Sequence, residues 1–170
     1  MGLLRKLRGS HGGDRTRTAT PHDGEWLRYA SPSGLFSLSH PRDWIADAGK
    51  GNTNIVNFDG PQSSGALTAS GYFGRLTPDE ERQVFSGTFG RFEPISKPVT
   101  VLGDGWSGTR QSFIDRQQAP PVFVDVVLAH GDEGFVLLTW NEPMPAVFGP
   151  DGPHAKAFSS LALQKPRGAR

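Results

Sequence analysis

The stretch Leu35-Phe-Ser-Leu-Ser-His-Pro-Arg-Asp-Trp44 decides the fold. Phe36 and Leu38 alternate with serines, which is typical of a half-buried strand. Pro41 has no backbone N–H to donate to a strand ladder, so residues 40–43 are expected to turn the chain. Trp44 then begins a second strand. The stretch predicts a strand, a corner and a strand, which is a fold signature and not an active site.

Strands are also expected on both sides of this stretch. One precedes it at 25–29, and two follow it at 54–58 and 66–73. The connections are short, so neighbouring strands should pair antiparallel in a meander. The small side chains of 66–73 suggest a central strand that a helix covers closely.

One helix is clearly marked after these strands. Thr77 can cap it, Pro78 suits its first position, and Glu80 completes a capping box. An apolar stripe with helical spacing should face the core. Its aromatic members are Phe85, Phe89 and Phe92. Gly87 and Gly90 weaken the second half, so the helix should end near 89–92.

Four strands and a short helix are expected in the second half of the chain. The strands are placed at 98–102, 106–115, 122–129 and 135–140. The last of these is apolar on both faces, so it is predicted to be central and covered on both sides. The helix begins at Pro153. The fold class is therefore α+β, an antiparallel β-sheet meander packed with helices.

Length and charge indicate one domain with basic ends. The 170 residues suit a single domain at 25–163, with a flexible basic leader at 1–24 and a basic tail at 164–170. Residues 23–164 hold ten basic and sixteen acidic side chains. This acidic body argues against a nucleic-acid partner. The absence of cysteine excludes disulfides and thiol chemistry and fits a reducing compartment.

The sequence predicts neither secretion nor membrane insertion. It has no apolar run of the length that a signal peptide or a membrane span requires. Residues 1–8, with three leucines among basic residues, could make a weak peripheral contact with a membrane. We therefore expect no integral membrane segment and a cytoplasmic location.

No residue pattern points to catalysis, a cofactor or a metal. Gly105-Trp-Ser107-Gly-Thr109 resembles a nucleophile elbow, but a strand and not a helix is expected after it. The five histidines include no metal-binding pair. His40 with Asp43 is interpreted as a polar corner, and His130 with Asp132 and Glu133 as a solvated hairpin tip. No catalytic, cofactor-binding or metal-binding residue is predicted.

The aromatic residues allow two interpretations. Trp44, Trp106 and Trp140 lie at expected strand ends, where they would anchor the core. Alternatively, these tryptophans and Tyr72 line a groove that binds an apolar peptide or ligand.

The order of motifs resembles a known superfamily. The sequence Phe36-Ser-Leu-Ser-His-Pro-Arg-Asp-Trp44 is followed by the strand at 66–73, the helix opened by Thr77-Pro-Asp-Glu80, and Trp106-Ser-Gly-Thr-Arg110. This order is similar to that of the Mog1/PsbP-like superfamily, including DcrB-type and related uncharacterised bacterial domains. The resemblance covers residues 25–163 and implies a Mog1/PsbP-like sandwich.

The resemblance implies a role in binding or assembly. Members of the superfamily include a Ran-binding nuclear transport factor, photosystem II subunits, lipoproteins and chaperones of secreted effectors. A bacterial, non-enzymatic protein is therefore expected, with a protein segment bound on its sheet or in an adjoining groove. A specific form of this expectation is a chaperone-like adaptor. The alternatives are a carrier of a small apolar ligand and a hydrolase-type enzyme. The identity of the protein partner and the oligomeric state stay open.

Overall fold

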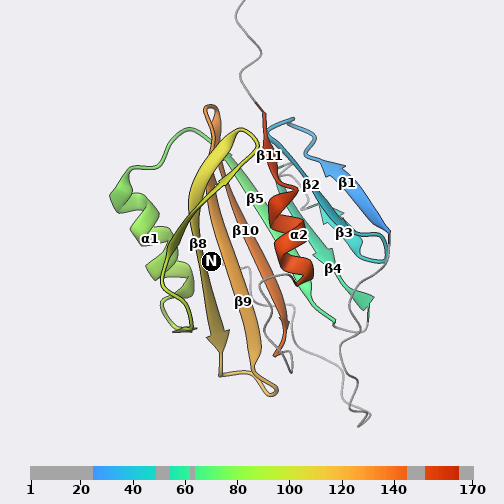
Figure 1. Cartoon of the computed structure of the whole chain (residues 1–170), viewed down its shortest axis with the longest axis vertical. Coiled ribbons are helices and arrows are strands. Elements are labelled where there is room, and N and C mark those ends of the chain that lie inside the picture. The colour runs from blue at the N-terminus through green and yellow to red at the C-terminus, as the bar shows by residue number, and fades with distance from the viewer. Residues whose placement is uncertain (1–24, 49–53, 62–63, 145–151, 165–170) are drawn as a thin grey trace, which may run out of the picture.

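The computed structural model describes residues 25–48, 54–61, 64–144 and 152–164. Two antiparallel sheets and two helices make up this part of the chain (Figure 1). The smaller sheet has the order β1-β2-β11, and its strands are β1 (Trp26–Ala30), β2 (Phe36–Pro41) and β11 (Ala162–Leu163). The expected leader at 1–24 and the tail beyond Gln164 lie outside the described residues.

The larger sheet has eight strands. From one edge to the other they are β3 (Ile45–Ala48), β4 (Ile55–Asp59), β5 (Ala66–Phe73), β10 (Gly134–Pro143), β9 (Val122–His130), β8 (Trp106–Asp115) and β6 (Glu93–Pro94), with β7 (Val99–Gly103) also paired to β8. The helices are α1 (Pro78–Phe89) and α2 (Pro153–Ser159). The α+β class is confirmed, and the very short strands β6 and β11 were not predicted.

The corner at 40–44 carries the chain from one sheet to the other. β2 belongs to the small sheet and β3 to the large one, so the predicted meander is wrong at this point. The Trp44 N–H donates to the Pro41 carbonyl oxygen at 3.1 Å and closes the turn. The Trp44 ring is buried and stacks on Trp140 of β10, with 4.6 Å between ring centroids. Burial of Trp44 therefore fixes how the two sheets face each other.

The main core lies between the two sheets. It is built from β2, β11 and α2 on one side and the facing side chains of the large sheet on the other. We call this side of the large sheet the inner face. Gly71 of β5 lies against Leu35 and Phe36, and a Cβ there would come within 3.0 Å of both side chains. The prediction that β5 is central is confirmed, and at Gly71 the cover comes from Leu35 and Phe36 and not from a helix.

The helix α1 packs on the opposite side of the large sheet, which we call the outer face. Its predicted capping box is confirmed: the Thr77 Oγ1 accepts from the Glu80 N–H at 3.3 Å, and the Glu80 carboxylate accepts from the Thr77 N–H at 2.8 Å. The Thr77 N–H and the Thr77 hydroxyl both donate to the Glu80 carboxylate and so lower its pKa. The buried Phe89 stacks on Phe113 of β8, in a second core cluster that also holds Val124 and Val126. In Figure 1, α1 lies on the β8 side of the molecule and α2 lies in front of β5 and β10.

β10 is central, as predicted, but it is fully covered on one face only. Its inner side chains Val136, Leu138 and Trp140 are completely buried. Its outer side chains Phe135, Leu137 and Thr139 are half-buried. The prediction of cover on both sides is therefore wrong, because α1 packs over β8 and β9 and reaches only Leu137 of β10.

Candidate functional site

The outer face can be followed in rows across the strands, because the pairing register is continuous. The row nearest the β9–β10 turn runs from Ser107 through His130 and Phe135 to Tyr72. The next row joins Thr109, Leu128, Leu137, Ser70 and Ile55. α1 covers the β8–β9 part of these rows, and the part on β10, β5 and β4 lies beyond it.

We call this uncovered part the open face. It consists of ten outward side chains on three adjacent strands: Ile55 and Asn57 of β4, Ala66, Thr68, Ser70 and Tyr72 of β5, and Phe135, Leu137, Thr139 and Asn141 of β10. Ser70 is buried among its neighbours, and Asp59, which is also outward on β4, lies at the end of the face beside Ala66. None of these ten side chains is charged. Absence of charge from a surface centre is characteristic of protein interfaces and unusual for a solvated sheet.

Aromatic rings lie at one end of the open face. Tyr72 is 41% exposed and stacks on Phe135, with 5.1 Å between ring centroids. Phe135 in turn lies 6.2 Å from the His130 ring. Nearer the centre of the face, Thr68 donates to the Asn57 side-chain oxygen at 2.9 Å.

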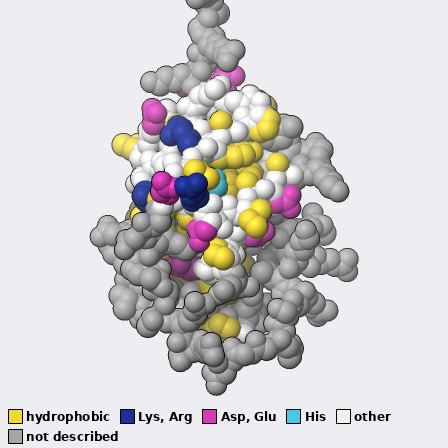
Figure 2. All heavy atoms as spheres, turned by 90° about the vertical axis from the view of Figure 1, so that its right-hand side faces the viewer, with side chains coloured by type: hydrophobic (Ala, Val, Ile, Leu, Met, Phe, Trp, Pro, Cys, Tyr) yellow, Lys and Arg dark blue, Asp and Glu magenta, His cyan; other side chains and the backbone are white. Residues whose placement is uncertain are grey.

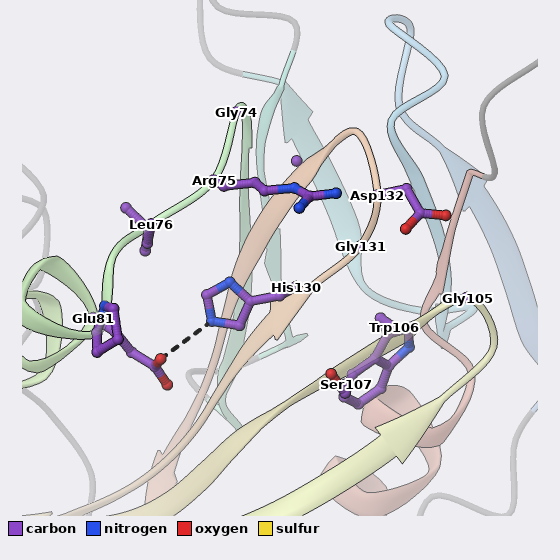
Figure 3. A pocket seen from close by; sticks show the side chains of 12 residues that line it. Gly74, Arg75, Leu76, Glu81, Gly105, Trp106, Ser107, His130, Gly131 and Asp132 are labelled. Carbon is purple, nitrogen blue, oxygen red and sulfur yellow. Dashed lines mark ion pairs between the residues drawn. The ribbon is translucent and has the colours of Figure 1, made fainter.

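A pocket adjoins this aromatic end (Figure 3). It has a volume of about 620 Å³ and lies between the start of α1 and the β5–α1, β7–β8 and β9–β10 connections. Its side chains with functional groups are Arg75, Glu81, Trp106, Ser107, His130 and Asp132. The Glu81 carboxylate accepts from Thr109 Oγ1 at 2.9 Å and lies 3.6 Å from His130 Nε2. His130 thus has a carboxylate partner, whereas the sequence analysis placed it at a solvated tip.

A second polar cluster is buried on the inner face under α2. Asp125 of β9 is completely buried and pairs with Arg110 of β8, whose Nη2 and Nε donate to Oδ2 at 2.7 and 3.1 Å. Ser112 donates to Oδ1 of the same carboxylate at 2.9 Å. His154 of α2 places Nε2 3.7 Å from Oδ2. Sequence reasoning missed this cluster, although a lone aspartate inside the apolar strand 122–129 signals a buried charge with a partner.

The side chains of this cluster are not arranged as in a serine-hydrolase triad. Asp125 lies between Ser112 and His154, whereas in a serine-hydrolase triad the histidine lies between the acid and the hydroxyl. Burial lowers the pKa of His154, which disfavours its charged form. Burial also raises the pKa of the nearby Glu142 carboxyl. The cluster ties α2 to β8 and β9.

The structure does not bring the four predicted groove residues together. Trp44 and Trp140 are buried in the core, 3% and 0% exposed, so neither side chain is available to a ligand. Trp106 lies beside the pocket, and its indole N–H donates to the Leu161 carbonyl at 2.9 Å. Tyr72 lies on the outer face. The interpretation of the tryptophans as core anchors is confirmed.

The other two candidates from the sequence, Ser107 and His40, lie in a strand and at the buried corner. Ser107 lies in β8, so the strand expected after it is confirmed and no elbow forms. His40 is buried at the corner, where Nδ1 lies 2.8 Å from the Pro41 carbonyl oxygen and the ring stacks on Phe58. Within the described residues, no group of three or more His, Cys, Asp or Glu side chains is placed to hold a metal ion.

Apolar side chains are also exposed where the edges of the two sheets lie near each other, on the β1–β3 side. Figure 2 views this side and shows hydrophobic side chains gathered among basic and acidic ones. They include Leu27 of β1, 45% exposed, and Ile45 of β3, 74% exposed. Ile45 pairs with Asp59 in the sheet, so its side chain extends the rim of the open face beyond β4.

Comparison with solved structures identifies the architecture. No family model matches the sequence. No curated protein matches it. The *Saccharomyces cerevisiae* Ran-binding protein Mog1p is similar over 82% of this chain and 96% of its own, with a TM-score of 0.58 and 9% identity. Cyanobacterial PsbP (CyanoP) from Synechocystis sp. PCC 6803 is similar over 92% and 98%, with a TM-score of 0.55 and 15% identity. The chain has the Mog1/PsbP-like fold.

A third structure extends this likeness. A protein from Bacteroides thetaiotaomicron has a TM-score of 0.59 and 12% identity, and the match covers 84% of this chain but half of that protein. No helix in the described part of the chain is long and apolar enough to cross a membrane.

Proposed function

We propose that this Mog1/PsbP-like domain is a non-enzymatic binding or assembly protein that holds a segment of a partner protein on the open face. The observation that carries the proposal is the unequal cover of the outer face. α1 packs over β8 and β9, whereas the ten side chains that define the open face are uncharged and only Leu137 among them packs with the α1 cluster. A surface of this kind gains free energy when a partner removes it from water.

Other features of the structure support binding over the two alternatives. A carrier of a small apolar ligand needs an enclosed apolar cavity, whereas the described pocket is open and lined by Arg75, Glu81 and Asp132. A hydrolase needs a nucleophile next to a base, whereas the Ser112 hydroxyl donates to a carboxylate that Arg110 already neutralises.

Site-specific cross-linking in cells that make the protein tests the proposal. A photoreactive phenylalanine analogue replaces Thr68 at the centre of the open face or, as the matched control, Thr88 on the exposed side of α1. We expect a defined adduct from position 68 only, with the cross-links confined to one contiguous segment of one partner protein by mass spectrometry. Equal adducts from both positions, or none from position 68, would contradict the proposal.

A further inference from the structure

We infer that the partner segment is a basic amphipathic helix of about three to four turns. This inference rests on the proposed function, because it names the chemistry of what the open face receives. Three features carry it: the dimensions of the face, its continuity with the surface that α1 covers, and the carboxylates at its ends.

The dimensions of the open face fit one helix. Six residue steps separate Ala66 from Tyr72 along β5, which corresponds to about 20 Å at about 3.3 Å per residue. A helix rises about 1.5 Å per residue, so about 13 residues cover this length. The three strands β4, β5 and β10 span about 10 Å, which is close to the width of a helix with its side chains.

The outer face already binds one helix in this manner. α1 packs Phe89 against Phe113, Val124 and Val126 on the adjacent strands. A helix satisfies its own backbone hydrogen bonds and needs only an apolar stripe to pack on a sheet. An extended peptide would leave its backbone groups unpaired over the centre of a sheet, since strand addition takes place at an edge.

Acidic side chains surround the open face. Asp132 and Glu133 are exposed in the β9–β10 turn, next to the end of β5, where the Gly74 N–H donates to the Glu133 carbonyl. Asp59 is exposed at the opposite end, paired in register with Ala66, and Asp47 is exposed on the outer edge strand. Among the described residues, none of these four carboxylates has an arginine, lysine or histidine partner within 4.0 Å.

Three other exposed carboxylates of the domain are already paired. Glu25, Asp79 and Glu93 each contact an arginine. Arg75 points across the pocket toward Asp132 in Figure 3. Among the described residues, the four carboxylates at the rim have no ion-pair partner, which leaves the rim negative at both ends. A complementary segment therefore carries lysine or arginine near each of its ends and an uncharged stripe between them.

Selection from a phage-displayed library of random 16-residue peptides tests the inference. Peptides retained by the wild-type protein are sequenced, and those also retained by the Thr68→Trp variant are discarded. This variant blocks the centre of the open face without changing its charge. We expect the remaining peptides to repeat apolar residues at helical spacing and to be enriched in lysine and arginine toward both ends.

Binding of the most enriched peptide, made synthetically, should then depend on the rim. Asp59→Lys and Asp132→Lys are each expected to weaken it about three- to fivefold, and salt should weaken it further. A peptide with glutamate in place of its basic residues should bind the double variant Asp59→Lys/Asp132→Lys more tightly than it binds the wild-type protein. Circular dichroism of each variant confirms that its fold is retained.

The outcomes separate the inference from the proposed function. If the peptides that depend on the open face are acidic, neutral or without helical spacing, the inference is overturned and the proposed function stands. If no peptide depends on Thr68, the proposed function fails and the inference fails with it.

Discussion

The two faces of strand β10 differ more than any other pair of surfaces in this domain. On the inner face, Val136, Leu138 and Trp140 are completely buried. On the outer face, Phe135, Leu137 and Thr139 alternate with them and stay partly exposed. The same ten residues thus contribute to the core on one side and to an accessible surface on the other. The difference separates the side chains that stabilise the fold from those available to a partner.

The cause of this difference lies in what packs on each face. The small sheet and α2 together cover the inner face of β4, β5, β9 and β10. Among the described residues, α1 and the adjoining Phe92 pack on the outer face, over β8 and β9. The larger core cluster therefore lies on the inner face and the smaller one on the outer face.

Replacing Trp44 with alanine tests the inner face and should have the largest effect. The ring is 3% exposed and stacks on Trp140, so its loss leaves a cavity between the two sheets. We expect the free energy of unfolding to fall by about 3–5 kcal/mol, measured by chemical denaturation. Thr139→Ala on the outer face is the matched control and should change it by less than about 1 kcal/mol. Similar losses in the two variants would remove the distinction between the faces.

The buried ion pair of the inner face should give the next largest effect. Asp125→Asn leaves Arg110 without its counter-charge, and we expect a loss of about 2–4 kcal/mol. The range extends down to about 2 kcal/mol because the Arg110 side chain is 27% exposed, so water partly solvates its unpaired charge. The double variant Arg110→Met/Asp125→Leu should recover most of the loss, because it removes both charges and keeps apolar volume. If the double variant is no more stable than Asp125→Asn, the cluster stabilises the fold through more than charge pairing.

Stability should also depend on pH through the inner-face histidines. Burial lowers the pKa of His40 and of His154 below the ordinary value of 6.5. The unfolded chain therefore takes up protons near pH 6.5 while the folded chain resists them, so stability is full above this pH and falls below it. We expect a loss on the order of 1 kcal/mol, measured by denaturation between pH 7.5 and about pH 5.

The Glu142 carboxyl and a variant that lacks both histidines make this pH experiment sharper. Burial raises the pKa of Glu142 above its ordinary 4.5, so its contribution is present in acid and is lost as the pH rises above about 4.5. Its slope opposes that of the histidines. The double variant His40→Gln/His154→Gln should remove the loss below pH 6.5 and expose the opposite slope. If the free energy of unfolding of the wild-type protein does not change between pH 7.5 and 5, the pH dependence assigned to His40 and His154 is wrong.

Much of the fold follows from local sequence signals. The bounds of β5 and β8 and the capping box at Thr77 were predicted as observed, because alternation, turn residues and caps act over a few residues. The change from the small sheet to the large sheet after Pro41 was not predicted. A short connection favours pairing between the two strands that it joins, and the residues near the corner do not show which sheet each strand enters. The end of α2 at Ser159 and the strand β11 depend on the distant β2.

The candidate site was less accessible to sequence reasoning. The open face exists because α1 stops short of β10, and only the register across three strands brings Tyr72, Phe135 and His130 into one row. The tryptophans were the most conspicuous aromatic residues, yet three of them are buried core residues. Aromatic residues in a sequence show which strands carry apolar side chains, but not whether those side chains face the core or the solvent.

Replacing Tyr72 with serine should have the smallest effect on stability and a large effect on binding. The ring is 41% exposed and contacts Phe135 at the edge of the open face, outside both core clusters. We expect the free energy of unfolding to change by about 0.5 kcal/mol or less.

The same variant should lose the partner that cross-links to position 68, because an exposed aromatic ring within an interface contributes strongly to affinity. Val99→Ser on the edge strand β7, 52% exposed in the wild type, is the control and should keep the partner. A Tyr72→Ser protein that is strongly destabilised would place this ring in the core, and the outer face would then resemble the inner one. A protein that is equally stable and still binds would move the partner from the open face to another surface.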